Sequence, residues 1–252
     1  MMMDPARQLV ERGFVALDHV FAVDDIDALH AEYRRQFPDI ERAPEQYLVG
    51  ERRIQVTMKL VGPFLSPRLY ANPQILEIVE AVLGPDLLID NFSLVCALPG
   101  APEQHEHADH PDLFPGEPFI RAVVQPYAIN VAIPLVDLTP ETGTTNLFAG
   151  SHRSDIDPDD FEAPYLKRGG CYLADYRLSH FGTENRSADE RPIVYLAFAR
   201  SWFIDRSNYG DNIRIAIDRS DLKRVPPEHR PLFRRLAAKG AFDCSERALF
   251  DD

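Results

Sequence analysis

The sequence predicts a mainly β protein, an antiparallel barrel or jelly roll, with helices at the N-terminus and at the C-terminus. From Leu87 onward the apolar residues follow the two-residue period of strands. No helical segments alternate with these apolar runs, which disfavours a doubly wound parallel sheet. Pro and Gly are dense between the runs, as in residues 99–102 and 111–118, and this is typical of the turns in all-β folds.

The first third is expected to be helical with one early strand, over residues 13–17. Asp24 is the expected N-cap of a first helix, whose apolar face recurs every three or four residues. Asn72 caps a second helix, Pro73 occupies its first position, and Gly84 and Pro85 end it.

Four apolar segments are then expected to be strands, and one late segment to be a helix. The strands cover residues 87–98, 127–135, 170–176 and 193–203, and the helix covers residues 231–239. We find no internal repeat, low-complexity tract or linker in the chain. The sequence therefore predicts one domain over residues 1–252.

The composition excludes several classes of protein. The 252 residues carry 27 basic and 40 acidic side chains, a net charge of −13, which disfavours nucleic acid or an anionic membrane as partner. No apolar stretch approaches the roughly 20 residues of a membrane span, and the first residues lack the layout of a secretion signal. Only three cysteines occur, with no close pair, so a disulfide framework or a Cys-based zinc site is disfavoured and a cytoplasmic location is expected. The oligomeric state is left open.

The strongest chemical signal is residues 104–110, which hold three histidines and two acidic residues. On an extended backbone, His105, His107 and Asp109 share one face and His110 lies on the other. One interpretation is a zinc-dependent hydrolase, because His105, His107, Asp109 and His110 match the zinc signature of the metallo-β-lactamase superfamily. Pro111 follows the motif directly, without the Gly-Gly pair and helix of that superfamily, so we keep this reading as the alternative.

The preferred interpretation combines His107 and Asp109 with a histidine on a later strand. His180 completes a set of two histidines and one carboxylate, which leaves three positions on Fe(II) for a bidentate cosubstrate and dioxygen. Arg191 follows eleven residues after His180 and opens an apolar strand. An arginine in such surroundings requires an anion, and its planar fork suits the distal carboxylate of 2-oxoglutarate.

With these residues in place, the chain resembles the phytanoyl-CoA dioxygenase-like family of Fe(II)/2-oxoglutarate-dependent oxygenases over about residues 10–205. The matching segments are residues 12–18, 104–109, 134–143, 150–153 and 180–191. The resemblance implies a double-stranded β-helix, a cupin-like jelly roll.

The resemblance also implies roles for individual residues. His107, Asp109 and His180 are expected to bind iron, and Arg191 the distal carboxylate of 2-oxoglutarate. Further contacts to the cosubstrate are expected from three residues, Gln104, Thr145 and Lys59. His152 matches a Gly-Ser-His turn of the family and is expected to be structural.

The activity implied is that of a dioxygenase that oxidises a C–H bond of a small molecule and releases succinate and CO₂. Related halogenases have Gly or Ala where Asp109 stands, so hydroxylation is favoured, with desaturation, epimerisation and cyclisation as variants. A member that binds metal or ligand without turnover is a third possibility. Asn91, Phe92 and Trp202 are candidates for the substrate pocket, and residues 154–168 and 204–219 for its lid. The substrate is left open, although the lack of a Lys/Arg cluster disfavours a CoA thioester.

Overall fold

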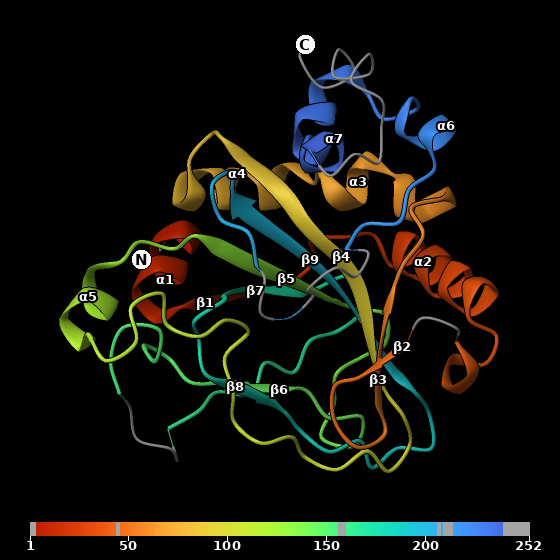
Figure 1. Cartoon of the computed structure of the whole chain (residues 1–252). Helices are drawn as coiled ribbons and strands as arrows, with labels where there is room; N and C mark the ends of the chain where they lie inside the picture. The colour runs from red at the N-terminus through yellow and green to blue at the C-terminus, as the bar shows by residue number, and fades with distance from the viewer. Residues whose placement is uncertain (1–3, 44–45, 156–159, 206–207, 209–213, 239–252) are drawn as a thin grey trace.

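The computed structural model describes residues 4–43, 46–155, 160–205, 208 and 214–238. It contains two antiparallel sheets with helices along one side. In Figure 1 the helices α3, α4 and α7 lie above the large sheet and the strands β6 and β8 lie below it. In the described part of the chain, every helix is too short or too polar to cross a bilayer.

The large sheet has seven strands in the order β1-β7-β5-β9-β4-β3-β2, and every neighbouring pair is antiparallel. Its strands are β1 (Phe14–Leu17), β2 (Gln46–Leu48), β3 (Arg53–Thr57), β4 (Leu87–Ala97), β5 (Ala128–Pro134), β7 (Cys171–Asp175) and β9 (Arg191–Arg200). The small sheet pairs β6 (Thr145–Leu147) with β8 (His180–Gly182). The expected late strands correspond to β4, β5, β7 and β9, of which β9 ends at Arg200 rather than at residue 203. The strands β6 and β8 are not among those expected.

The helices gather at the two ends of the chain, with one short helix between β4 and β5. They are α1 (Pro5–Arg12), α2 (Val23–Gln36), η1 (Ile40–Arg42), η2 (Gly62–Leu65), α3 (Pro67–Tyr70), α4 (Pro73–Leu83), α5 (Pro118–Val123), α6 (Arg219–Leu222), η3 (Pro227–Phe233) and α7 (Arg235–Ala238). Asn72 caps α4 as expected, because its side-chain oxygen accepts hydrogen bonds from the backbone N–H groups of Gln74 and Ile75.

The two faces of the large sheet pack against different parts of the protein. The outer face of the sheet and the helices share the main core, which includes Leu29 of α2, Val79 of α4 and Leu94 of β4. The inner face looks towards the small sheet, and Leu147 of β6 packs there in a second cluster with Tyr172 and Ala174. The space between the two sheets is where residues from both can meet, as in other sandwiches.

Three expectations for the chain ends are wrong. The N-cap of α2 is Ala22, and Asp24 lies inside the first turn. Its negative charge there stabilises the helix, because the N-terminal end of the helix dipole is positive. The first third also contains β2 and β3, which were not expected. The late helix is divided, because Pro231 lies within the 3-10 helix η3 and only Arg235–Ala238 is α-helical. Its expected end at residue 239 lies outside the described residues.

Candidate functional site

Three side chains, His107, Asp109 and His180, meet between the two sheets and form what we call the metal-binding group. One nitrogen each from His107 and His180 and one oxygen of Asp109 all lie within 4.8 Å of one another. The backbones of His107 and His180 form an antiparallel bridge, with N···O distances of 2.9 Å and 2.8 Å in the two directions. Their rings lie 4.5 Å apart between centroids. Residues 73 positions apart are therefore held together by the backbone rather than by their side chains.

The hydrogen bonds around these three residues leave metal-binding atoms free. Nδ1 of His107 lies 3.0 Å from the carbonyl oxygen of His105, and Nδ1 of His180 lies 2.9 Å from that of Leu178. Because a carbonyl only accepts, each Nδ1 carries the proton and each Nε2 offers its lone pair. Asn130 of β5 donates to Oδ2 of Asp109 at 3.1 Å, and this bond orients the carboxylate.

The electrostatics of the group also favour a bound cation. Burial lowers the pKa of His107, and the neighbouring His180 lowers this pKa further. A neutral imidazole is the form that binds metal. Two imidazoles and one carboxylate form the donor set found in non-haem Fe(II) sites, so the residues present fit such an ion.

The other two histidines of the motif lie outside this group. The ring of His105 packs beside that of His107 with 5.6 Å between centroids, and His105 is exposed. Nδ1 of His110 lies 2.7 Å from the carbonyl oxygen of Pro111, and the His110 ring contacts Phe203. The four-residue set of the zinc hydrolase alternative is thus not gathered around one point.

Arg191, the first residue of β9, is buried with a relative exposure of 4%. Its guanidinium donates to the backbone carbonyls of Thr142 at 2.9 Å and Thr183 at 3.2 Å, and its Nε has no partner. Burial lowers the pKa of Arg191. No carboxylate of the described residues forms an ion pair with Arg191. Because an uncompensated buried charge is costly, this guanidinium is suited to binding an anion.

A second arginine, Arg53 of β3, lies beside Arg191 and was missed in the sequence. It is 1% exposed and donates to the carbonyls of Pro102 at 2.7 Å and Thr183 at 2.6 Å. Its Nε and one terminal nitrogen have no partner. Burial and the repulsion of Arg191 lower the pKa of Arg53 to about 10. An available signal was the position of Arg53 at the start of a short alternating segment, Arg53–Thr57, which places it on the same face as Gln55.

Gly143 makes room for Arg191. Its φ of +79° is in the left-handed region, and a Cβ at this position would overlap a terminal nitrogen of Arg191 and the carbonyl oxygen of Glu184. The turn that contains Gly143 therefore passes directly against the guanidinium.

A row of buried hydroxyls lies near both the arginines and the metal-binding group. Tyr172 donates to Oγ1 of Thr145 at 3.0 Å, and its hydroxyl lies 3.4 Å from that of Tyr195. Burial raises the pKa of both tyrosines, so they remain neutral hydrogen-bond donors. The negative charge of Asp109 adds to this rise, which places the hydroxyls within electrostatic reach of the carboxylate.

Two further expected cosubstrate contacts have other partners. The amide of Gln104 accepts from the backbone N–H of Gly182 at 3.0 Å and donates to the carbonyl of Val49 at 2.6 Å. The ammonium of Lys59 forms an ion pair with Asp218 at 2.6 Å and is half-exposed. Gln104 therefore joins backbone segments, and Lys59 joins the C-terminal segment rather than the buried arginines.

The remaining sequence candidates are divided between the faces. Phe92 lies in the outer core against Phe64, so its expected place in a pocket is wrong. Asn91 is on the inner face opposite Ala197. Trp202 is 63% exposed and lies beside Tyr127. His152 is fully buried and its Nε2 lies 3.1 Å from the carbonyl oxygen of Val10, as a structural residue requires.

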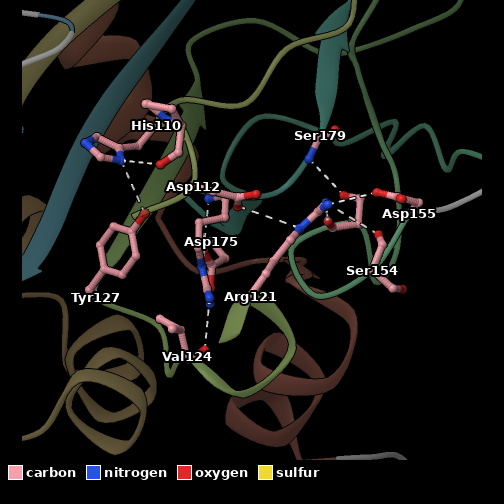
Figure 2. Close-up of polar contacts among 12 residues, drawn as sticks. His110, Asp112, Arg121, Val124, Tyr127, Ser154, Asp155, Asp175 and Ser179 are labelled. Carbon is pink, nitrogen blue, oxygen red and sulfur yellow. Dashed lines mark hydrogen bonds and ion pairs between the residues drawn. The ribbon is translucent and has the colours of Figure 1, made fainter. Parts of the chain in front are cut away.

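A network of polar contacts ties the rim of the site together. Figure 2 shows Arg121 of α5 reaching to Asp155 and to the backbone at Ser154. Arg121 also donates to the carbonyl of Ser151, whose hydroxyl accepts from the N–H of Ser179 at 2.8 Å. These bonds connect the segment after Asp109 to the residue that precedes His180. Residues 156–159 and most of 206–213, parts of the expected lid, lie outside the described residues.

Solved structures share this architecture. EctD from S. alaskensis, solved with 2-oxoglutarate and 5-hydroxyectoine, has a TM-score of 0.61 and 19% identity, covering 86% of this chain and 88% of that one. HygX from Streptomyces hygroscopicus, solved with nickel and 2-oxoglutarate, has a TM-score of 0.61 and 14% identity, covering 86% and 95%. The epimerase SnoN of nogalamycin biosynthesis has a TM-score of 0.61 and 18% identity, covering 78% and 80%. The expected jelly-roll fold is confirmed.

Sequence comparison identifies the family. A curated relative, dioxygenase af480 of Aspergillus fumigatus, is 31% identical over 138 residues, which are 52% of this chain. The match spans 43% of that relative's length. The family model described as phytanoyl-CoA dioxygenase (PhyH) matches residues 9–193, a region that includes the metal-binding group and Arg191. This chain belongs to the phytanoyl-CoA dioxygenase family.

Proposed function

We propose that this protein is an Fe(II)- and 2-oxoglutarate-dependent dioxygenase that hydroxylates a C–H bond of a small molecule. The observation that carries the proposal is the pairing of two unlike groups between the sheets. His107, Asp109 and His180 offer three ligands to a cation. Arg53 and Arg191 offer two buried positive charges without an anion. A dicarboxylate that chelates a metal at one end satisfies both groups.

The described residues bind and orient the cosubstrate in this proposal. The distal carboxylate of 2-oxoglutarate accepts hydrogen bonds from Arg191 and Arg53, whose free nitrogens lie in a dry environment. The hydroxyls of Thr145 and Tyr195 can donate along its length, while Tyr172 donates to Oγ1 of Thr145. The large sheet on one side and the small sheet on the other exclude water from the cosubstrate.

With dioxygen, the iron and 2-oxoglutarate supply the oxidation of the C–H bond, with release of succinate and CO₂. Asp109 holds one metal position, and Asn130 keeps its carboxylate in place. The burial of His107 keeps its imidazole neutral and ligating. Epimerisation is the reaction in the name of SnoN, and product analysis distinguishes it from hydroxylation.

Anaerobic addition of Fe(II) and 2-oxoglutarate tests the proposal. We expect a visible charge-transfer band that His107→Ala abolishes and Arg191→Ala weakens. His105→Ala is the matched control, since this neighbouring histidine lies outside the metal-binding group and should leave the band intact. Absence of the band in the wild-type protein contradicts the proposal. A band without succinate formation for any substrate identifies a binding protein without turnover.

The zinc hydrolase alternative makes the opposite prediction for the same variants. A hydrolase that uses His105 and His110 loses its metal when either is changed to alanine, and it needs no 2-oxoglutarate. Metal content measured by atomic emission after purification separates the two cases.

A further inference from the structure

A β-bulge in β4 decides which of its side chains faces the space between the sheets. Leu88 is paired with Ala199 of β9, and the register then shifts so that Asn91 is paired with Ala197. Leu88 and Asn91 therefore share the inner face although they are three residues apart. In a regular strand, residue 90 would follow residue 88 on that face. The bulge removes Asp90 from the inner face and puts Asn91 there.

The carboxylate of Asp90 is neutralised elsewhere. It forms ion pairs with Arg214, at 2.7 Å, and with Arg235. All three residues are buried, and both arginines belong to the C-terminal segment that covers the start of β4. A negative charge is thus kept out of the inner face and fixed by two cations.

Across the inner face, Asn91 belongs to a row without ionisable side chains. Ala197 of the central strand β9 is in register with Asn91 on one side and with Asn130 of β5 on the other. Adjacent strands are about 4.8 Å apart, so the two asparagines are about 10 Å apart with only a methyl group between them. Asn130 also contacts Asp109, which places the row next to the metal-binding group.

Both asparagines have a buried polar atom without a partner. Asn91 is 2% exposed, and its amide nitrogen lies 3.0 Å from Oγ of Ser93, while its oxygen has no partner. The side-chain oxygen of Asn130 is buried and has no partner either. Buried amides are normally satisfied, so these atoms point to a bound molecule.

The row lies at the other end of the inner face from the two arginines. Arg191 opens β9, and Ala197 follows six residues later on the same face, about 20 Å along the strand. Tyr195 lies between them on the same face, and the negative charge of Asp109 contributes to the raised pKa of its hydroxyl. The cosubstrate would therefore occupy the arginine end. The asparagine end, where Ala197 packs in an apolar cluster with Tyr127 and Phe203, would be left to a second molecule.

We propose that Asn91 and Asn130 bind the substrate, and that this substrate presents an uncharged hydroxyl or amide N–H donor to them beside the metal. The inference rests on the proposed function, because it assumes that the other end of the inner face holds 2-oxoglutarate. The neutral amides select against a carboxylate, which would meet the oxygen atoms of both asparagines. They also select against an ammonium, because an ammonium binds more tightly to a carboxylate, and the bulge removes the carboxylate of Asp90 from this face.

Three probes with the same apolar ring test the selection: cyclohexylmethanol, cyclohexanecarboxylate and cyclohexylmethylammonium. Their binding to the full chain, loaded with Zn(II) and 2-oxoglutarate, is measured by saturation-transfer NMR. We expect the alcohol to bind most tightly to the wild-type protein. Replacement of Zn(II) by Mn(II) should broaden the probe resonances, because the row lies next to the metal-binding group.

Two variants of Asn91 sharpen the test. Asn91→Ala should weaken the alcohol about tenfold, the effect of one lost hydrogen bond to a buried group. Asn91→Asp should reverse the order of the probes, so that the ammonium binds more tightly than the alcohol. Asn72→Asp is the matched control, since aspartate also caps α4 and this site lies on the outer side.

The result can be separated from a failure of the proposed function. A wild-type protein without the Fe(II)/2-oxoglutarate charge-transfer band overturns the proposed function. If the band forms but the wild-type protein prefers a charged probe or binds none, the present inference is wrong. The inference is also wrong if Asn91→Ala binds the alcohol as the wild type does. The wild-type ranking needs no variant, so a variant that fails to fold does not remove the test.

Discussion

Arg53 and Arg191 donate hydrogen bonds to the same acceptor, the backbone carbonyl of Thr183. The two guanidinium groups come from different strands, β3 and β9, and no carboxylate of the described residues pairs with either. Repulsion between them contributes to the lowered pKa of Arg53. A dianionic cosubstrate would relieve this repulsion, so its binding and the stability of the protein should be linked.

Arg53→Gln should raise the dissociation constant of 2-oxoglutarate by about tenfold or more, because a hydrogen bond to a charged group is lost. Titration of the anaerobic charge-transfer band measures this constant. Arg52→Gln is the control, since Arg52 is exposed and donates its Nε to the carbonyl of Pro99. Equal constants for both variants would mean that Arg53 only braces the backbone.

Asn130→Ala should weaken metal binding by about 10- to 100-fold, because Asp109 loses the hydrogen bond that orients its carboxylate. Titration with Co(II), followed by its visible absorption, gives the affinity without need for a substrate. An unchanged affinity would show that Asp109 is held in place without the amide.

Gly143→Ala and Gly150→Ala separate backbone strain from displacement of Arg191. Both glycines have positive φ, +79° and +85°, so backbone strain from either alanine should lower the free energy of unfolding by about 1–2 kcal/mol. Gly143→Ala should lower it further, because its Cβ also overlaps the backbone oxygen of Glu184. A Cβ at Gly150 meets nothing within 4 Å, whereas one at Gly143 overlaps Arg191. Only Gly143→Ala should also weaken 2-oxoglutarate binding. Urea unfolding and titration of the charge-transfer band test the two effects separately.

His152 should make the stability of the metal-free protein depend on pH. Burial lowers the pKa of His152 from its ordinary value of 6.5, so the unfolded chain binds the proton more readily than the folded one. The stabilisation is therefore complete above pH 6.5 and is lost as the pH falls through the lower, folded pKa. His152→Gln should flatten the curve of unfolding free energy against pH over this range. His30 and His107 have pKa shifts of the same direction, so part of the slope persists in the variant. An unaltered slope would contradict the assignment to His152.

The sequence predicted the residues whose role follows from spacing. Asn72 and Pro73 define a helix start that depends only on neighbouring backbone groups, and β5 shows a two-residue period over seven residues. His107, Asp109 and His180 were recognised together because a late histidine followed by Arg191 accompanies the short motif. The metal-binding group of the structure contains the same three residues.

Long-range contacts could not be predicted in this way. Arg53–Thr57 is short and mostly polar, and it becomes a strand only because β4 pairs with it. Arg53 is buried through the position of β3 in the sheet, and the alternation over Arg53–Thr57 indicates only which residues share its face. Lys59 has the same positive charge but pairs with Asp218, a residue 159 positions later in the chain. Gln104 is close to the metal-binding residues in sequence, yet its amide is used by Val49 and Gly182.

The backbone bridge between His107 and His180 has a consequence for how such a protein can diversify. Main-chain bonds fix the distance between the two histidines. This distance therefore does not depend on the long connections on either side of α5 and after β6. Insertions, deletions and new side chains in those connections can alter the surroundings of the oxidised bond while the two imidazoles stay in place. Sequence changes in these loops can therefore alter which substrate is bound without displacing the histidines.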